Sequence, residues 1–453
     1  MGRSGLGRHS GTSHLSRHSK KLRRPSCQTD CELKRRAPAS SRLSASPYPC
    51  PQTPNSAAIA TMVMTPPPKR LCGRSLLDLP DDLIPEILLR LPPHDPRRLV
   101  RCSAVCKPWR RLLTDPAFLR RYRAFHGVPP MLGLLFHLEL PSNRFLARFV
   151  RTTSFRPRTL DHAGCYVRDA RHGRILFRNV TGEENDHDLF VWSPVTDEVW
   201  GLYMPCPFYY WNVAVVCAAA AREGGCDCDH LDCHGGPFLV AFVDTDDDGM
   251  TYARVYSSET GAWSDATYAQ HPNGLADMDM LEPIALVGNR IYFPAAQSKT
   301  IVEYDLGRRK LAFVDPPLPH QGHGILMPAM GGGLGFASVR GSRLYLWSRE
   351  IAGSDRTAAA WTQSRVLELS TLPDRETRVP LNQPTALGFT EILMEEDMTA
   401  VGFAEGLGVI FVTTSAGVFA INLESGQVKK MSGRRPVPDV VIPYMSFYTP
   451  GNF

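Results

Sequence analysis

The most regular hydrophobic pattern in the first part of the chain lies in the stretch LPDDLIPEILLRL, residues 79–91. Five apolar side chains in it recur at the spacing of one helix face: Leu83, Ile84, Ile87, Leu88 and Leu91. A proline inside a helix costs about 3 kcal/mol, but Pro85 would lie in the first turn, where backbone N–H groups have no intrahelical partner. The pattern therefore predicts a helix from about residue 84 to Leu91, with Asp82 or Ile84 as its N-cap.

Two further helical stretches follow. Asp95 as N-cap and Pro96 at the first position predict a second helix, which continues to Cys106. A third stretch, KPWRRLLTDPAFLRRY, carries apolar residues on both sides of a Thr-Asp-Pro break. Three short helices in about 45 residues build a core that is marginal alone. We therefore expect their apolar faces, beginning with Leu79 and Pro80, to dock on another protein.

From about residue 135 the pattern changes to the period-two alternation of β-strands. Five pairs of such runs recur, and the second run of each pair has an apolar residue at an equivalent position: Trp192, Tyr256, Tyr304, Leu367 and Ile421. All-strand repeats of roughly 50 to 60 residues predict a β-propeller, with a period near that of kelch repeats. A mixed β-sandwich is the main alternative.

The two ends of this strand-rich region predict how the ring closes. A propeller usually completes one blade with strands from both ends, which removes exposed edges. RFLARFV, residues 144–150, is the candidate first strand, and DVVIPYMSFY, residues 439–448, is the candidate last one. The five visible units and this shared blade predict six blades over residues 135–449, with five or seven as the alternatives.

Composition and charge add an N-terminal tail to this picture. Residues 1–70 contain 13 Lys and Arg against two acidic residues, whereas the rest of the chain is slightly acidic. We expect residues 1–72 to be a disordered basic tail, because they are rich in Ser, Pro and Gly and poor in aromatic residues. Its basic clusters are candidate nuclear import signals or nucleic-acid contacts, and a plastid or mitochondrial transit peptide also fits the composition.

The distribution of cysteines and apolar residues indicates in which cellular compartment the protein is expected. The 12 cysteines are scattered along the chain, and the basic N-terminus has no apolar core of a secretory signal. The longest apolar run, VAVVCAAAA, is far shorter than the ~20 residues of a membrane span. We therefore expect reduced thiols in a protein of the nucleus, the cytoplasm or both, with no membrane partner.

Two stretches were considered as metal sites. DTDDDG, residues 244–249, matches the start of a calcium loop, but Val255 stands where the bidentate Glu belongs, so an acidic hairpin turn is predicted. CDCDHLDCH offers five candidate metal ligands: Cys226, Cys228, His230, Cys233 and His234. Its C-x-C start departs from the usual zinc spacing and no second pair lies nearby, so we predict a surface loop without metal.

Enzyme signatures are missing from the sequence. It has no G-x-S-x-G, no phosphate-binding loop and no dinucleotide fingerprint. His172 in RHGR is predicted to be a turn or core histidine rather than a general base. No catalytic residue and no cofactor site are therefore predicted.

The helical stretch closely resembles an F-box over residues 77–122. The resemblance rests on the Leu79-Pro80 opening, the Ile87-Leu88-x-x-Leu91-Pro92 helix end and the block from Val105 to Leu112. It implies a three-helix F-box domain at about residues 75–123 that docks on the Skp adaptor of a cullin-RING ubiquitin ligase. The adaptor-facing positions that it implies are Leu79, Pro80, Ile84, Leu88, Leu91, Val105, Cys106 and Trp109. For Trp109 and Leu99, a purely structural role in so small a core is equally open.

The strand-rich region resembles the divergent, kelch-like propellers that follow F-boxes in plant proteins. Together the two resemblances imply a non-catalytic substrate-recognition subunit of a Skp-cullin-F-box ligase, in which the propeller captures a protein for ubiquitin-dependent degradation. Two alternatives stay open. Buried carboxylates or histidines in the central channel would favour a propeller-based enzyme. Binding whose affinity falls strongly with salt concentration would favour a nucleic-acid binder acting through the basic tail.

Overall fold

The computed structural model describes the chain in twelve segments: residues 83–140, 144–181, 187–205, 210–221, 228–272, 282–294, 300–317, 324–350, 360–370, 372, 398–432 and 438–450. The predicted tail at residues 1–72 and the Leu79-Pro80 pair lie outside the described residues. Among those described, no helix is long and apolar enough to cross a membrane.

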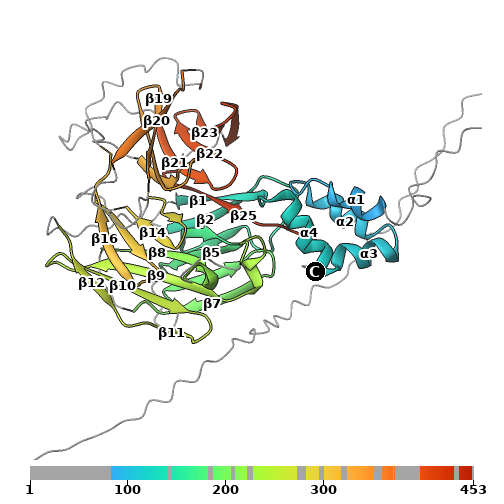
Figure 1. Ribbon diagram of the computed structural model, residues 1–453, viewed down its shortest axis with the longest axis horizontal. Helices are drawn as coiled ribbons and strands as arrows, with labels where there is room; N and C mark the ends of the chain where they lie inside the picture. The colour runs from blue at the N-terminus through green and yellow to red at the C-terminus, as the bar shows by residue number, and fades with distance from the viewer. Residues whose placement is uncertain are drawn as a thin grey trace, which may run out of the picture. The chain divides into compact units, whose positions relative to one another are not determined.

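The helical stretch forms four helices: α1 (Leu83–Leu89), α2 (Pro96–Ser103), α3 (Lys107–Thr114) and α4 (Pro116–His126) (Figure 1). Pro85 lies in the first turn of α1, as predicted. The third predicted helix is divided at the Thr-Asp-Pro break, where the Asp115 carboxylate accepts a hydrogen bond from the Phe118 N–H at 2.8 Å and begins α4. Asp95 occupies the N-cap of α2, but its side chain pairs with Arg98 at 3.0 Å instead of capping the helix.

The described strands form six sheets of four strands or more, which confirms the six-bladed propeller (Figure 1). In order across each sheet, the first blade contains β25 (Val441–Met445), β1 (Met131–Leu140), β2 (Arg144–Arg151) and β3 (Asp161–Ala163), and the second contains β4 (Cys165–Arg171), β5 (Arg174–Asn179), β6 (Leu189–Ser193) and β7 (Glu198–Leu202). The third blade contains β8 (Tyr210–Cys217), β9 (Phe238–Thr245) and β10 (Met250–Ser257), with both β11 (Ala262–Trp263) and β12 (Thr267–Gln270) paired to β10, and the fourth contains β13 (Ala285–Val287), β14 (Arg290–Phe293), β15 (Ile301–Asp305) and β16 (Lys310–Val314). The fifth blade contains β17 (Gly324–Pro328), β18 (Leu334–Arg340), β19 (Arg343–Arg349) and β20 (Trp361–Glu368), and the sixth contains β21 (Thr399–Ala404), β22 (Val409–Thr414), β23 (Gly417–Asn422) and β24 (Val428–Ser432).

The ring closes through strands from both ends of the region. β25 pairs antiparallel with β1, with Leu135 opposite Ile442, and it also lies beside β21 and β4. The predicted closing strand is therefore confirmed, but the first strand is β1 rather than the RFLARFV run, which is β2. β1 was not predicted as the first strand because its residues 132–136 are all buried, on both faces, so that apolar and polar residues do not alternate along it.

One of the five predicted equivalent positions lies on a different strand from the others. Trp192, Tyr256, Tyr304 and Ile421 lie on the third strand of their blades, but Leu367 lies on β20, the fourth strand of its blade. The reason is the tight turn between Arg340 and Arg343, which joins β18 to β19 so closely that the two strands looked like one run. Trp347 on β19 is the third-strand counterpart.

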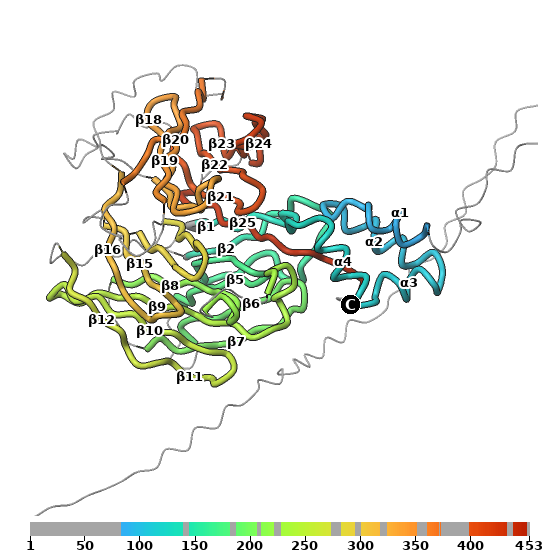
Figure 2. The backbone as a smooth tube through the Cα atoms, in the orientation of Figure 1, coloured from blue at the N-terminus to red at the C-terminus, as the bar shows by residue number. Residues whose placement is uncertain are grey.

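Hydrophobic cores fill the space between neighbouring blades. One cluster joins the third and fourth blades, another joins the fifth and sixth, and a third joins the first and second. The four helices have a core of their own, and this core includes Phe447 and Leu231 from the strand-rich part of the chain. The backbone after β25 reaches α4 at this point (Figure 2). The described residues between 83 and 450 accordingly belong to one compact unit.

Candidate functional site

Helix α4 completes the helical domain by bonding to the end of α1. The Tyr122 hydroxyl donates to the Leu91 carbonyl at 2.7 Å, and Nε2 of His126 lies 3.0 Å from the Leu89 carbonyl. Carbonyls at a helix C-terminus have no partner within the helix, so these bonds satisfy groups that would otherwise need water. Burial raises the pKa of Tyr122, which keeps its hydroxyl protonated as a donor.

Three of the predicted positions belong to the core of this domain. Leu88, Leu99 and Trp109 are all at most 6% exposed and pack in one cluster with α3 and α4. Leu88 and Trp109 were predicted to face the adaptor, and for Trp109 and Leu99 a purely structural role was left equally open. Their burial means that in the isolated chain they are core side chains of this domain.

The other described positions are more open. Ile84, Leu91 and Cys106 are half-buried at the edge of the same cluster, and Val105 is 52% exposed in the turn between α2 and α3. Two apolar residues of α1, Leu83 and Ile87, are also exposed, although the prediction did not place them among the adaptor-facing positions. Both belong to the run of apolar positions at helical spacing that the sequence shows in residues 83–91.

Charge around these residues is strongly positive. Residues 83–126 contain ten Lys and Arg against three acidic residues. Glu86 on α1 pairs with Arg121 and Arg90, and these hydrogen bonds lower the pKa of its carboxyl. The pairing of Glu86 with Arg121 ties α1 to α4 and leaves most of the basic side chains of the helices unpaired with any acidic residue of the domain.

The helical domain matches a known family. The family model for the F-box domain covers residues 76–121, the segment that contains α1, α2, α3 and the start of α4. Residues 76–121 are an F-box domain. An Arabidopsis thaliana protein named "Putative F-box protein" is 25% identical to the chain over 201 residues, which are 43% of this chain and 48% of that protein. The chain thus spans about half the length of this curated relative.

Solved structures resemble the strand-rich part only loosely. A protein of unknown function from Bacteroides caccae has a TM-score of 0.38 at 10% identity, over 69% of this chain and 98% of that chain. Virginiamycin B lyase from Staphylococcus aureus has a TM-score of 0.28 at 9% identity, over 71% of this chain and 94% of that chain. At these TM-scores the likeness supports no inference about function.

A cavity of about 280 Å³ lies among the inner strands of the ring and the segment that follows α4. Arg171 at the end of β4 forms ion pairs with Asp169 and with Glu405, which follows β21, and it donates a 2.6 Å hydrogen bond to the Ile284 carbonyl before β13. Burial raises the pKa of Asp169 to about 6 despite the neighbouring guanidinium. Arg171 therefore joins three blades across the channel and neutralises its two nearest carboxylates.

The turn between β4 and β5 places His172 against the Cys/His loop that was considered as a metal site. His172 is in the left-handed region with φ 51° and stacks on His230, with ring centroids 4.3 Å apart. Its Nδ1 accepts a 2.9 Å hydrogen bond from the Cys217 N–H, and burial lowers the pKa of the ring to about 3. His172 is therefore a turn histidine, as predicted, and it positions its neighbours.

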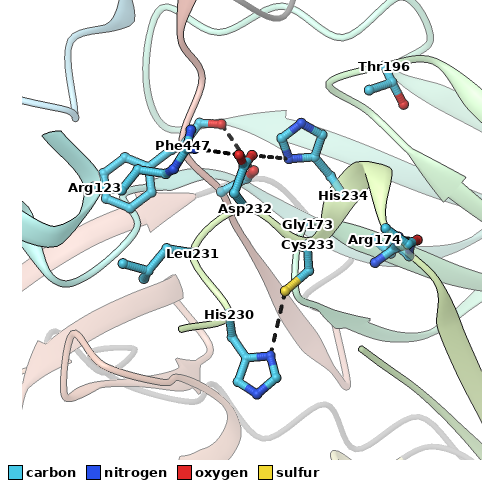
Figure 3. A network of polar contacts seen from close by, with 12 residues as sticks. Arg123, Gly173, Arg174, Thr196, His230, Leu231, Asp232, Cys233, His234 and Phe447 are labelled. Atoms are coloured by element: carbon cyan, nitrogen blue, oxygen red, sulfur yellow. Dashed lines mark hydrogen bonds and ion pairs between the residues drawn. The ribbon is translucent and has the colours of Figure 1, made fainter. Parts of the chain in front are cut away.

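The structure gathers four sulfur and nitrogen ligands beside this turn. Cys217, Cys228, His230 and Cys233 place one ligand atom each within 4.8 Å of all the others. The pKa of the Cys217 thiol is lowered to about 4, mainly by a hydrogen bond from Cys233, whereas this same hydrogen bond, followed by burial, raises the pKa of Cys233. Cys226 lies outside the described residues, and His234 turns away to Asp232, with 3.3 Å between Nδ1 and the carboxylate (Figure 3).

The acidic stretch at residues 244–249 is a hairpin turn between β9 and β10, as predicted. The Asp246 carboxylate accepts hydrogen bonds from the N–H groups of Asp248 and Met250. Asp244 is buried and pairs with Arg254 at 3.0 Å. These carboxylates hold the turn and the two strands together, which accounts for their clustering.

Proposed function

We propose that the chain is the substrate-recognition subunit of a Skp-cullin-F-box ubiquitin ligase. In this role the F-box domain docks on a Skp adaptor and the propeller captures a protein to be ubiquitinated. The observation that carries the proposal is the F-box domain at residues 76–121 joined directly to a closed six-bladed propeller. Propeller rims present many loops on a rigid ring, which suits protein capture.

The exposure of the F-box side chains divides the docking residues into two groups. Exposed Val105, together with the half-buried Ile84, Leu91 and Cys106, would contact the adaptor directly. Leu88 and Trp109 would hold the helices in the orientation that docking needs. Residues 83–126 contain ten basic and three acidic residues. This excess of positive charge favours an adaptor surface that is acidic around its apolar centre.

The mechanism that we propose is proximity without catalysis by this chain. Binding a substrate on the propeller and the ligase on the F-box holds the substrate at a high effective concentration near the charged ubiquitin-conjugating enzyme. Such a role requires two surfaces and a stiff connection between them. The core that α1–α4 share with Phe447 and Leu231 provides that connection.

A propeller-based enzyme is the second candidate, because Asp169 and Glu405 line the central cavity. Arg171 pairs with both carboxylates, and this arrangement fits a brace between blades better than a proton-transfer pair. We therefore favour the adaptor-binding role. Binding through the basic tail to nucleic acid, and residence in the nucleus or cytoplasm, stay as proposals from composition.

The test of the proposed function is co-purification with a Skp adaptor. The double substitution Leu79→Ala with Pro80→Ala removes the opening of the F-box motif. It is expected to abolish capture of the adaptor while the propeller keeps its circular dichroism spectrum. Unchanged capture by the double variant, or no capture by the wild type, would overturn the proposal.

A further inference from the structure

Four metal-ligand side chains come together from two parts of the third blade. Cys217 is the last residue of β8, and Cys228, His230 and Cys233 follow in the loop that leads to β9. Sγ of Cys217 lies 4.0 Å from Sγ of Cys228, which lies 3.3 Å from Sγ of Cys233. Nδ1 of His230 lies 3.5 Å from Sγ of Cys233 (Figure 3).

These separations fit the edges of a zinc tetrahedron. With Zn–S bonds of about 2.3 Å and a Zn–N bond of about 2.0–2.1 Å, tetrahedral angles require about 3.8 Å between sulfurs and about 3.6 Å between sulfur and nitrogen. The sulfur–sulfur distances of 3.3 and 4.0 Å lie on either side of the first value, and the 3.5 Å distance to nitrogen matches the second. Side chains that only filled a core would not need to point all four donor atoms at one spot.

The protein around the cluster holds the ligands in place. Cys217 is 6% exposed and Cys233 is 5% exposed, one at the end of a strand and the other at the start of the 3-10 helix Cys233–Gly235. The backbone of Cys217 donates to His172, and the His172 ring stacks on His230. His230 has φ 56°, a conformation that non-glycine residues adopt at a cost and that aims its ring at the sulfurs.

Charge in the surroundings also suits a bound cation with thiolate ligands. Three thiolates and one neutral imidazole around a divalent ion carry one net negative charge. The buried Arg174 guanidinium interacts electrostatically with both Cys217 and Cys233 and so offsets that charge. Four protein ligands fill a tetrahedral zinc ion and leave no open position, which is typical of a structural rather than a catalytic site.

We propose that Cys217, Cys228, His230 and Cys233 bind one structural zinc ion. This replaces the expectation of a metal-free loop, which considered only residues 226–234. The fourth ligand comes from Cys217, at the end of the preceding strand and outside that stretch of sequence. His234 is not a ligand, because it faces Asp232.

The proposed ion has a role in the architecture. Leu231 and Asp232 lie between the ligands His230 and Cys233, and these two residues contact the F-box domain. Leu231 packs on the helical core, and Asp232 pairs with Arg123 of α4 (Figure 3). Fixing the loop at both ends by zinc would therefore keep the F-box domain firmly on the propeller.

The experiment measures zinc in the purified full chain. Wild type isolated under reducing conditions is expected to hold about one zinc per chain by elemental analysis. Cys228→Ser with Cys233→Ser should lose it, and Cys165→Ser, at a buried cysteine whose thiol donates to the Ala163 carbonyl outside the cluster, should keep it. A zinc-free wild type, a Cys228–Cys233 disulfide in its place, or zinc retained by the double variant would overturn the proposal.

A matched pair at His230 separates metal binding from folding. His230→Asn tolerates the positive φ but supplies a poor zinc ligand, whereas His230→Cys supplies a fourth thiolate. The Cys variant is expected to keep zinc and the Asn variant to lose it, with both giving the wild-type circular dichroism spectrum. Cobalt exchanged into the wild type should show tetrahedral d–d absorption, and octahedral absorption or equal zinc in the two variants would contradict the site.

Discussion

A nitrogen of the Arg123 guanidinium in α4 lies 2.5 Å from a carboxylate oxygen of Asp232 in the loop after β8. Arg123 is almost fully buried, whereas Asp232 is 40% exposed and also faces His234. This ion pair joins the F-box domain to the propeller next to the apolar contact between Tyr122 and Phe447, whose ring centroids are 6.2 Å apart. The two domains therefore share one interface that is both charged and apolar.

Asp232→Ala tests the charged half of this interface. We expect the free energy of unfolding to fall by about 1–3 kcal/mol, because the Arg123 guanidinium is left buried without its partner. The matched control is Asp161→Ala, which removes a partly exposed pair with Arg148 and should cost less than about 1 kcal/mol. Urea unfolding of the full chain measures both. Equal losses in the two variants would mean that the Arg123 pair contributes no more than a surface pair.

Phe447→Ala tests the apolar half. Phe447 is 2% exposed in the F-box core, so its truncation should cost about 3–5 kcal/mol and loosen the helices. Amide hydrogen exchange over residues 83–126 should become faster. The control is Phe125→Ala, at a side chain of α4 that is 52% exposed, and it should change exchange little. If both variants leave exchange as it is in the wild type, the helices do not depend on the propeller for their order.

Removal of residues 439–453 tests ring closure. The truncation deletes β25, which completes the first blade by pairing with β1, and so exposes the edge of β1. We expect the truncated chain to lose cooperative thermal unfolding and to become poorly soluble. Removal of residues 1–72, the predicted tail, should leave the melting temperature unchanged by circular dichroism. A C-terminal truncation that melts cooperatively at the original temperature would show that the ring closes without β25.

His137 on β1 predicts how stability depends on pH. Burial, followed by the positive charge of Arg168, lowers the pKa of His137 to about 4 in the folded protein, from 6.5. Since the fold disfavours the protonated ring, the stability that the neutral ring contributes is fully present above pH 6.5. It is lost as the pH falls from 6.5 toward 4. Between about pH 7.5 and about pH 5, this should remove about 2 kcal/mol from the free energy of unfolding.

The control for His137 is His137→Phe, which keeps a ring against Tyr166 and cannot titrate. Urea unfolding of wild type and variant at both pH values isolates the histidine. The variant should lose about 2 kcal/mol less than the wild type on acidification. Parallel pH dependence of the two proteins would rule out His137 as the source.

Local signals predicted those parts of the fold that local physics decides. Pro85 and Pro96 fit only in the first turn of a helix, so the starts of α1 and α2 followed from single residues. The Thr-Asp-Pro break was visible in the sequence, but the prediction did not make Asp115 the N-cap of a separate fourth helix. Alternation gave five of the blades, and it failed at β1, whose central residues are buried on both faces.

Contacts between distant parts of the chain could not be predicted from local sequence signals. Cys217 reaches Cys228 because β8 and the loop before β9 return to the same end of the blade, which spacing alone does not reveal. Phe447 belongs to the F-box core only because ring closure carries the last strand back to α4. The brace from Arg171 to Glu405 spans 234 positions of sequence for the same reason.

The central claim, that the F-box domain docks on a Skp adaptor, is tested most directly by calorimetric titration of the full chain with the purified adaptor. Val105→Asp places a charge at an exposed apolar position of the F-box, and Val199→Asp does the same at a comparably exposed position of β7 in the propeller. The account predicts that Val105→Asp weakens the Kd at least about tenfold, or about 1.4 kcal/mol, while Val199→Asp binds like the wild type. Equal affinities for all three proteins, or no binding by the wild type, would contradict it.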